Sequence, residues 1–496
     1  MTPIRPVSSG FWCAPVVACV LTAAAWWLPP APASAQVNGT VRDMGDHRVV
    51  HLWGSPEEMG YAHGYLLGDS ILALASGYAL ALFGLTPSEY EMFRGLILVM
   101  LDFPDERVAE AGALIEGMRD AGVELYREEL GREIDADDVL LINAAADMFG
   151  VELGCSSISA WGAATEDDAE LDGELAMVRD LDWRWQGSEA DLRDHSVVFA
   201  FEPSTPGTQR WISMAFPGFI GCLSCLNEQG VGAFQDQGNH PRTIVELDLS
   251  DDLVPIHLSL RAGIEAQDYD GDGAGTIHDA VAAVTETGRL GTYDIQLISP
   301  ADRTDPPAAV LEADNGGWAL RLPTDDPLPA PDCLAVTNHD RLLHPPEPCN
   351  RYGTIEAMVD DLDGQFDLER LWAIEAAVAQ SWGSGGTIQT VRVIPAELRV
   401  DVAFADHGGL APDNPITSHE WPWLFEDEGP TDDDDTTDDD DDDDAGDDDA
   451  GDDDDDDETG GEASLGPGSC GCGTGGGAAP LTGAGLLLLA LVRRRP

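Results

Sequence analysis

The sequence predicts an α+β fold, in which a mostly helical first part precedes a part that mixes strands with separate groups of helices. Apolar residues recur at helical spacing through residues 55–132, and short β-type runs begin after Met177. The chain has 496 residues, of which 43% are hydrophobic. That is enough for one large domain or two ordinary domains with a sizeable core.

Residues 36–154 are predicted to be mostly helical because their apolar residues lie three to five positions apart along the chain. These residues are Met59, Ala62, Leu66, Ile71 and Leu74. The run 96–101 is more apolar still, but Pro87 and the surrounding charges argue against a membrane span.

Residues 155–430 are predicted to hold eight strands and three helices. The β-type runs span 196–201, 211–214, 231–234, 295–298, 309–312, 334–337, 390–394 and 398–404, and the helical runs span 255–265, 278–285 and 368–379. Two separated helical groups among the strands favour α+β layers over a doubly wound sheet.

The charge of the chain excludes several kinds of function. All 25 basic residues are Arg, against 93 acidic residues, and the net charge is −68. Without Lys, the chain has no phosphate-loop lysine, Schiff-base lysine or Ser-Lys dyad. So negative a surface repels nucleic acid, and no nucleic-acid partner is expected. It suits a salty or divalent-rich medium, and a compositional habit of the genome is the alternative.

Residues 1–35 have the pattern of a secretory signal peptide. Arg5 precedes the apolar run 15–28, and Ala33-Ser34-Ala35 follows it, so cleavage is expected after Ala35. An uncleaved anchor is the alternative, although the prolines after residue 28 end the apolar run early. The chain is therefore expected to be exported.

The other end of the chain carries a second targeting pattern. Residues 432–458 contain 20 Asp and one Glu, so 431–469 is predicted to be a disordered spacer. Residues 470–496 follow with Cys-Gly-Cys, a short apolar run and three Arg. This order resembles the myxobacterial C-terminal sorting signal, which implies a sorting protease, contact with the membrane through this segment, and a protein that is displayed on the cell surface, associated with the outer membrane or secreted.

Five cysteines remain between residues 36 and 430, and an exported protein can form disulfides. Local spacing predicts the pairs Cys222–Cys225 and Cys333–Cys349, which leaves Cys155 as a free thiol. A zinc site on Cys222 and Cys225 is the alternative, but neither a second Cys pair nor a His-x-x-x-His run lies nearby.

Five short motifs lie in order along the chain. They are 153–157 (LGCSS), 178–183 (VRDLDW), 226–231 (LNEQGV), 336–339 (VTNH) and 350–352 (NRY). With the upstream run 59–64 (MGYAHG), they resemble the autoproteolytic acyltransferase/hydrolase family of N-terminal-nucleophile hydrolases, whose best-known member is acyl-coenzyme A:6-aminopenicillanic acid acyltransferase. Bile-salt hydrolases, penicillin V acylases and acid ceramidase are wider kin. The resemblance implies a four-layer αββα fold.

The resemblance also implies roles for individual residues. Self-cleavage between Gly154 and Cys155 would make Cys155 the N-terminal nucleophile. The family's arginine and aspartate fall on Arg179 and Asp182, and its oxyanion asparagine falls on Asn338.

Three further positions match the family less cleanly. A late family arginine falls on Arg351, which opens a helix. The oxyanion-side residue after the Gly230 turn is Gln237 or Asn239, and we favour Gln237. Asp180 stands where relatives usually have Asn, and His63 and His339 are interpreted as structural.

The expected roles agree with the chemistry of these groups. A Cys at a new N-terminus has an α-amine with an ordinary pKa of about 7.7–8.0, which can accept the thiol proton at neutral pH. Asp182 can hold that amine, and Arg179 can lower the thiol pKa or bind a substrate carboxylate. One oxyanion donor such as Asn338 is worth about 3–4 kcal/mol.

Each residue also has a structural interpretation. A single Cys is often a buried apolar filler, and Arg179 with Asp182 could form a structural ion pair. Asn338 could cap a turn, and Arg351 could cover a helix face.

Residues 268–279 resemble a calcium loop. Asp268, Asp270 and Asp272 occupy positions one, three and five, a glycine occupies position six, and Asp279 falls at position twelve, where Glu is usual. A calcium site is one interpretation and an acidic turn is the other; no cofactor is required for the expected chemistry.

Together these observations predict an exported, self-processing hydrolase or acyltransferase that cleaves a linear, small-molecule acyl amide through a Cys155 thioester. Hydrolysis is favoured because coenzyme A thioesters are scarce outside the cell. The alternative is a catalytically silent, surface-displayed binding or adhesion protein of the same fold. A papain-type protease and a serine hydrolase are disfavoured, because their sequence signatures are missing.

Overall fold

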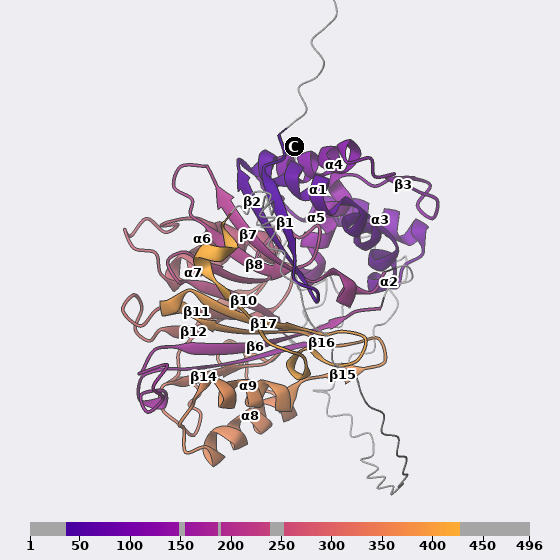
Figure 1. Cartoon of the computed structure of the whole chain (residues 1–496). Coiled ribbons are helices and arrows are strands. Elements are labelled where there is room, and N and C mark those ends of the chain that lie inside the picture. Colours follow the sequence, from indigo (N-terminus) through magenta and orange to yellow (C-terminus); the bar gives the residue numbers. More distant parts are fainter. Residues whose placement is uncertain (1–35, 148–153, 187–189, 239–251, 427–496) are drawn as a thin grey trace, which may run out of the picture. The chain divides into compact units, whose positions relative to one another are not determined.

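A computed structural model describes residues 36–147, 154–186, 190–238 and 252–426. These residues build two β-sheets with helices outside both, and Figure 1 shows their arrangement. The predicted C-terminal spacer and sorting segment, and the predicted signal peptide, lie outside the described residues. None of the described helices is long and apolar enough to cross a membrane.

The first sheet has nine strands in the order β1-β2-β7-β8-β9-β10-β11-β12-β13. Its neighbours are antiparallel except β2 and β7, which run parallel. The strands are β1 (Gly39–Asp43), β2 (Arg48–Gly54), β7 (Val197–Pro203), β8 (Trp211–Ala215), β9 (Ser224–Asn227), β10 (Gly232–Gln237), β11 (Tyr293–Ile298), β12 (Ala308–Asp314) and β13 (Gly317–Arg321).

The second sheet has seven strands in the order β14-β5-β6-β16-β17-β18, with β15 also paired to β16. These strands are β5 (Gly154–Ala160), β6 (Ala176–Arg184), β14 (Cys333–Val336), β15 (Ser381–Trp382), β16 (Gly385–Ile394), β17 (Arg399–Phe404) and β18 (Thr417–Glu420). A separate hairpin consists of β3 (Tyr126–Arg127) and β4 (Arg132–Glu133).

Apolar side chains fill the space between the two sheets. Val198, Met214 and Phe234 of the first sheet pack in one fully buried cluster with Met177 and Val391 of the second. Strand alternation directs these residues inward, since side chains at i and i+2 share a face.

Helices cover the outer face of each sheet. On the second sheet, α8 (Asn350–Asp361) and α9 (Leu368–Val378) pack over Ile158 and Val178 (Figure 1). On the first sheet, α6 (Ile256–Glu265) contacts β9 and β10, and α7 (Ile277–Thr285) packs on α6. The layers are therefore helix, sheet, sheet, helix, and the predicted αββα arrangement is confirmed.

The N-terminal helices form a group of their own. They are α1 (Pro56–Ala73), the π-helix η2 (Leu74–Tyr78), α2 (Ala79–Phe83), α3 (Pro87–Met100), α4 (Asp105–Asp120) and α5 (Ala136–Asn143). Ser55 with Glu58, and Thr86 with Glu89, form capping boxes that begin α1 and α3. Glycines let α1 and α4 approach closely: a Cβ on Gly64 would fall 1.8 Å from the Leu114 carbonyl oxygen.

All eight predicted strand runs are strands in the structure, and the three predicted helical runs are helices. In the predicted helical part, the described residues 36–147 are mostly helical, but the first 19 of them contribute β1 and β2 to the nine-stranded sheet. Because β2 pairs with β7, the part upstream of Cys155 and the part downstream share one sheet.

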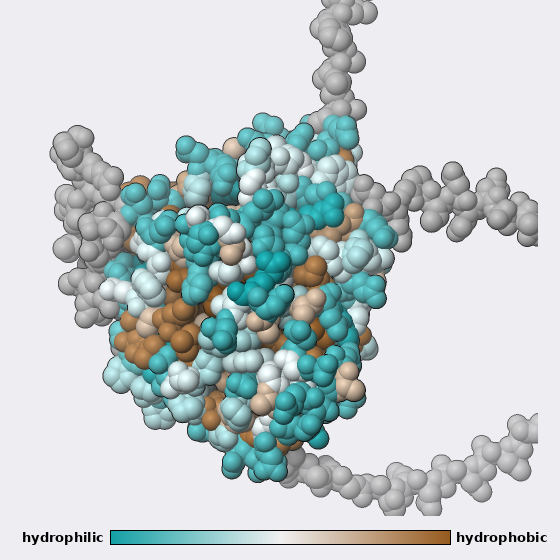
Figure 2. Space-filling view, turned by 90° about the vertical axis from the view of Figure 1, so that its left-hand side faces the viewer, coloured by the Kyte–Doolittle hydropathy of each residue, from teal (hydrophilic) through white to brown (hydrophobic). Residues whose placement is uncertain are grey.

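Figure 2 shows a face that is largely hydrophilic, with hydrophobic residues gathered in a larger and a smaller area.

Candidate active site

Cys155 lies at the beginning of β5 and faces the space between the sheets. It pairs with Leu181 of β6, and only 2% of its surface is exposed. Ser157, two residues on and therefore on the same face, donates to Gln296 of β11 at 2.6 Å across the gap. The thiol is thus directed towards the nine-stranded sheet.

The thiol of Cys155 lies against the guanidinium of Arg179. Arg179 Nη2 is 3.3 Å from the sulfur, and Arg179 is itself held by Ser224 at 2.7 Å and by Asp236 at 3.3 Å. Burial raises the pKa of the Cys155 thiol, and the positive charge of Arg179 opposes that shift. In the uncut chain the thiol is therefore protonated at neutral pH.

The backbone of Cys155 is held on both sides. Its N–H donates to Asn338 Oδ1 at 3.0 Å, and its carbonyl oxygen accepts from Arg351 Nη1 at 2.9 Å. Arg351 Nη2 also donates to Asn338 Oδ1, and Asn338 Nδ2 donates to the Gln237 carbonyl oxygen at 2.7 Å. Asn338 follows the end of β14 and Arg351 lies in the first turn of α8, so the two elements converge on the peptide of Cys155.

Asp182 of β6 is the cross-strand partner of Gly154, the residue that precedes Cys155. Its carboxylate accepts from Arg351 at 3.0 Å and from Thr387 at 2.5 Å. A Cβ on Gly154 would fall 2.8 Å from Asp182 Oδ2, so glycine is the residue that fits here. Burial raises the pKa of Asp182, and the positive charge of Arg351 opposes the shift.

Five predicted site residues come together in one buried cluster. Their ion pairs differ from the Arg179–Asp182 pair that the sequence offered as a structural interpretation. Arg179 pairs with Asp236 and not with Asp182, which pairs with Arg351 instead. Asp236 was missed. Phe234 lies in the core between the sheets, so strand alternation places Asp236 on the same inward face.

Gln237 reaches the site only through its backbone. Its side chain donates to the Thr292 carbonyl oxygen at 3.1 Å, while its own carbonyl holds Asn338. The alternative, Asn239, lies outside the described residues. His63 is buried, accepts from the Gly218 N–H at 3.1 Å and has a pKa lowered to about 3 by burial, in agreement with a structural role.

A second buried polar layer lies on the other face of β5 and β6. Ser156 donates to Glu375 of α9 at 2.6 Å, and Thr390 donates to Asp180 at 2.6 Å. Burial, together with the neighbouring charge of Asp182, raises the pKa of Asp180 to about 8. Burial also raises the pKa of Glu375 well above its ordinary range, so both carboxyl groups favour the protonated form.

A small apolar pocket, with a volume of about 30 Å³, lies between the N-terminal helices and β6. Its walls include Leu82, Leu141, Phe216 and Phe219, and Trp183 of β6 forms one side. Trp183 lies two residues beyond Leu181, the cross-strand partner of Cys155. Such diagonal neighbours on one face are separated by about 7–8 Å, so Trp183 lies between the pocket that it lines and Cys155.

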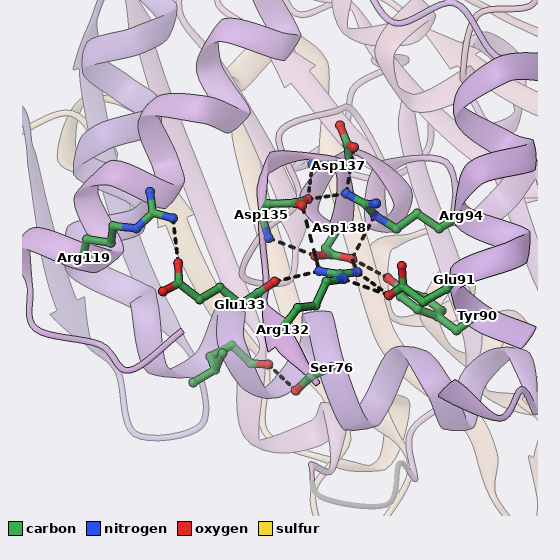
Figure 3. Close-up of polar contacts among 11 residues, drawn as sticks. Ser76, Tyr90, Glu91, Arg94, Arg119, Arg132, Glu133, Asp135, Asp137 and Asp138 are labelled. Atoms are coloured by element: carbon green, nitrogen blue, oxygen red, sulfur yellow. Dashed lines mark hydrogen bonds and ion pairs between the residues drawn. The ribbon is translucent and has the colours of Figure 1, made fainter. Parts of the chain in front are cut away.

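An ion cluster closes one side of this pocket. Asp138, which lines the pocket and is fully buried, accepts two hydrogen bonds from Arg132, one from the hydroxyl of Tyr90 and one from the backbone of Asp135 (Figure 3). Arg94 adds ion pairs to the same group of aspartates. The carboxylate of Asp138 is thus fully used and offers nothing to a ligand.

The cysteines follow the prediction in part. Cys222 and Cys225 form a disulfide, which excludes a zinc site on that pair, and Cys155 is a free thiol. The predicted Cys333–Cys349 bond is wrong, because Cys333 is also free. Its sulfur points into the core beneath α8 and lies 3.3 Å from the Ala330 carbonyl oxygen.

The predicted calcium loop lies between α6 and α7. Carboxylate oxygens of Asp268, Asp270 and Asp279 lie within 4.8 Å of one another, whereas Asp272 is outside this group. Asp279 also caps α7 by accepting from the Thr276 N–H at 2.8 Å. Calcium binding by this loop stays a prediction.

The chain is similar to two known proteins over part of its sequence. No family model matches it. An uncharacterised protein of Archaeoglobus fulgidus is 26% identical over 220 residues, and the Dictyostelium discoideum protein dcd1B is 26% identical over 218. Each alignment covers 40% of this chain, and the chain spans only 34% and 41% of those two relatives.

Three solved structures resemble the chain at low sequence identity. A Caenorhabditis elegans N-acylethanolamine-hydrolysing acid amidase ortholog gives a TM-score of 0.36 at 15% identity, covering 49% of this chain and 93% of its own. A conjugated bile acid hydrolase from Clostridium perfringens gives 0.34 at 13%, covering 55% and 95%. Penicillin V acylase from Agrobacterium tumefaciens gives 0.34 at 10%, covering 55% and 87%.

Proposed function

We propose that this chain is a self-processing cysteine amidohydrolase that cleaves linear acyl amides through a Cys155 thioester. One observation carries the proposal: the Cys155 thiol contacts Arg179 while Asn338 and Arg351 hold the N–H and carbonyl of the same residue. A buried cysteine that merely filled the core would not need a cation at its sulfur and two polar side chains on its backbone.

Processing begins with attack of the Cys155 sulfur on the Gly154 carbonyl carbon. The C–N bond of that peptide breaks as the thioester forms, and the thiol proton passes to the departing nitrogen. Water then hydrolyses the thioester, which leaves a carboxylate on Gly154 and a free α-amine and thiol on Cys155. Asp182, which lies against Gly154, and Asn338, which accepts from the Cys155 nitrogen, are placed to hold the new ammonium group.

Turnover then uses the new amine as the base. The α-amine takes the thiol proton, the thiolate attacks the substrate carbonyl, and the proton passes to the leaving amine as the thioester forms. Hydrolysis of the thioester restores the enzyme, and transfer to another amine is the alternative fate of the same intermediate. The second N–H of Asn338 Nδ2 serves as a donor to the oxyanion.

The acyl group is proposed to be apolar. The pocket beside Trp183 is lined almost entirely by aliphatic and aromatic side chains, and its buried carboxylate is already saturated. A polar group entering it would lose its hydrogen bonds to water without replacement. Export and surface display, as predicted from the two ends of the chain, remain part of this proposal.

Intact-mass analysis of the purified protein tests the proposal. We expect two fragments, with Cys155 at a new N-terminus, and a single chain for Cys155→Ala. Incubation of the cut protein with an apolar acyl amide and rapid acid quenching should add the acyl mass to the Cys155 fragment. A protein that stays uncut and forms no adduct would favour the binding or adhesion alternative.

A further inference from the structure

A row of three buried carboxylates crosses the inner face of the nine-stranded sheet beside the active site. Asp294 of β11 pairs directly with Asp236 of β10 on one side and with Glu312 of β12 on the other. All three are at most 1% exposed. Like charges directly opposite each other destabilise a sheet, so this row requires compensation.

The two outer carboxylates have cationic partners and the central one does not. Arg179 lies 3.3 Å from Asp236, and Arg321 lies 2.8 Å from Glu312. Neither oxygen of Asp294 has a hydrogen-bond partner among the residues that the structure describes. A buried, unpaired carboxylate is too costly to persist without a counter-ion or a proton.

A fourth carboxylate completes a pocket of oxygen atoms around Asp294. Asp340, two residues after Asn338, is only 4% exposed. One carboxylate oxygen each of Asp294, Glu312 and Asp340 lie within 4.8 Å of one another. A calcium ion binds oxygen at 2.3–2.6 Å, so two ligands on opposite sides of it lie about 4.6–5.2 Å apart. One oxygen of each carboxylate lies within 4.8 Å of the others, so a single ion of this kind can contact more than one of them.

Glu312 fixes the geometry of this cluster. Its two oxygens accept from the Arg321 side chain and from the backbone N–H groups of Arg341, Leu342 and Leu343. These bonds clamp the segment after β14 onto β12 and so hold Asp340 opposite Asp294. Because four donors occupy the oxygens of Glu312, this residue contributes its charge, and Asp294 supplies a ligand together with Asp340, whose carboxylate also lies 3.7 Å from His344.

We propose that Asp294 and Asp340, with the negative charge of Glu312 beside them, bind one hard divalent cation, with Ca²⁺ preferred, between the two sheets. All-oxygen, carboxylate-rich sites select such ions over zinc or copper. The bound cation would offset the negative charge of the carboxylates that Arg179 and Arg321 do not neutralise. It would also tie β11 to the segment that carries Asn338 and thereby position the proposed oxyanion donor. This last consequence rests on the proposed function, whereas the cation site itself does not depend on it.

Thermal unfolding of the full-length protein, stripped of metal with a chelator, tests the site. Added CaCl₂ should raise the Tm of the wild type by roughly 2–5 °C at constant ionic strength, since a ligand that binds only the folded state stabilises it. Asp294→Asn should unfold at a Tm close to that of the stripped wild type, because the amide keeps the size of the side chain and a buried carboxyl group without a cation must itself carry a proton. Its Tm should no longer respond to calcium through this site.

Matched variants separate this site from the other acidic regions. Asp270→Asn, in the loop between α6 and α7, should keep the part of the calcium response that Asp294→Asn loses. Asp340→Asn should lose it, and Asp294→Asn should bind one calcium fewer per chain by elemental analysis. MgCl₂ and NaCl titrations identify the preferred ion; a response to Na⁺ equal to that to Ca²⁺ would contradict divalent binding.

Two results would overturn the proposal. A wild-type Tm that does not respond to calcium would mean that Asp294 and Asp340 share a proton instead. An equal calcium response in the wild type and in Asp294→Asn would place the ion elsewhere. Cys155→Ala should respond like the wild type, so failure of the catalytic proposal leaves this test intact.

Discussion

At the scale of single residues, the site depends on contacts that only one residue type can make. Asn338 is an example, because its amide accepts from Cys155 and Arg351 with its oxygen and donates to Gln237 with its nitrogen. No other side chain of this size offers both an acceptor and two donors. The motif 336–339 predicted the residue, but its contacts with Arg351 required the fold.

Replacing Asn338 should damage turnover more than folding. Asn338→Ala removes an oxyanion donor, and we expect kcat on an apolar acyl amide to fall by about 10²–10³. The rate must be measured on the fully cut fraction, because processing passes through an oxyanion as well. Gln237→Ala is the control: only the backbone of Gln237 reaches the site, so its activity should stay within about threefold of the wild type. Full activity of cut Asn338→Ala would withdraw the assignment.

Gly154→Ala should slow processing without unfolding the protein. The added methyl group would lie 2.8 Å from Asp182 Oδ2, and that carboxylate is fixed by Arg351 and Thr387. We therefore expect the scissile peptide to be displaced and the uncut chain to accumulate in mass spectra over time. Gly95→Ala, where nothing lies within 4 Å, should process at the wild-type rate. Equal processing of both variants would contradict the role given to Asp182.

At the scale of secondary-structure elements, glycine sets how closely α1 and α4 pack. A Cβ on Gly64 would fall 1.8 Å from a backbone oxygen of α4, and backbone cannot move aside as a flexible side chain can. Gly64→Ala should therefore lower the Tm by several degrees, as overpacking costs typically 1–3 kcal/mol. Gly112→Ala, on the open side of α4, should be neutral or slightly stabilising. Calorimetry of the two variants compares these effects directly.

Periodicity predicted the strands of the second part well because their buried residues are strongly apolar and β-branched. It missed β5 and β6, which carry Cys155 and Arg179. The reason is chemical: β5 reads Gly-Cys-Ser-Ser-Ile-Ser-Ala, and β6 contains Arg179, Asp180 and Asp182 in positions that are fully buried. A strand that buries catalytic polar groups does not show the alternation that identifies ordinary strands.

The strands β1 and β2 were missed for a different reason. They precede the capping box of α1 by only a few residues, and their pairing with β7 joins positions that are about 150 residues apart in the sequence. Such a long-range parallel contact leaves no local signal. The prediction of a Cys333–Cys349 disulfide was wrong for a similar reason. The two residues are close in sequence, but Cys333 is a free thiol in the fold.

At the scale of the whole molecule, buried carboxyl groups make stability depend on pH. The pKa of Asp180 is raised to about 8, far above its ordinary value of 3.8. Between about pH 4 and pH 8 the folded state then holds a proton that the unfolded state has lost. The free energy of unfolding therefore falls as the pH rises through this window.

Asp180→Asn imitates the neutral acid at every pH. The Tm of the wild type should fall between pH 5 and pH 8, and the Tm of the variant should fall by less. The difference between the two proteins isolates this carboxyl from the repulsion among the surface charges, which both share. Identical slopes in differential scanning calorimetry would show that Asp180 does not titrate within this range.

The buried nitrogen of Cys155 has a consequence for chemical labelling. The chain contains no Lys, so in the processed protein the only primary amines are those at the start of each fragment. An amine-selective reagent would therefore report on the nucleophile without any mutation. Because Cys155 is 2% exposed and its nitrogen lies 3.0 Å from Asn338, a bulky reagent should modify it far more slowly than the outer terminus. The ratio of the two labelling rates would measure how often the site opens to solvent.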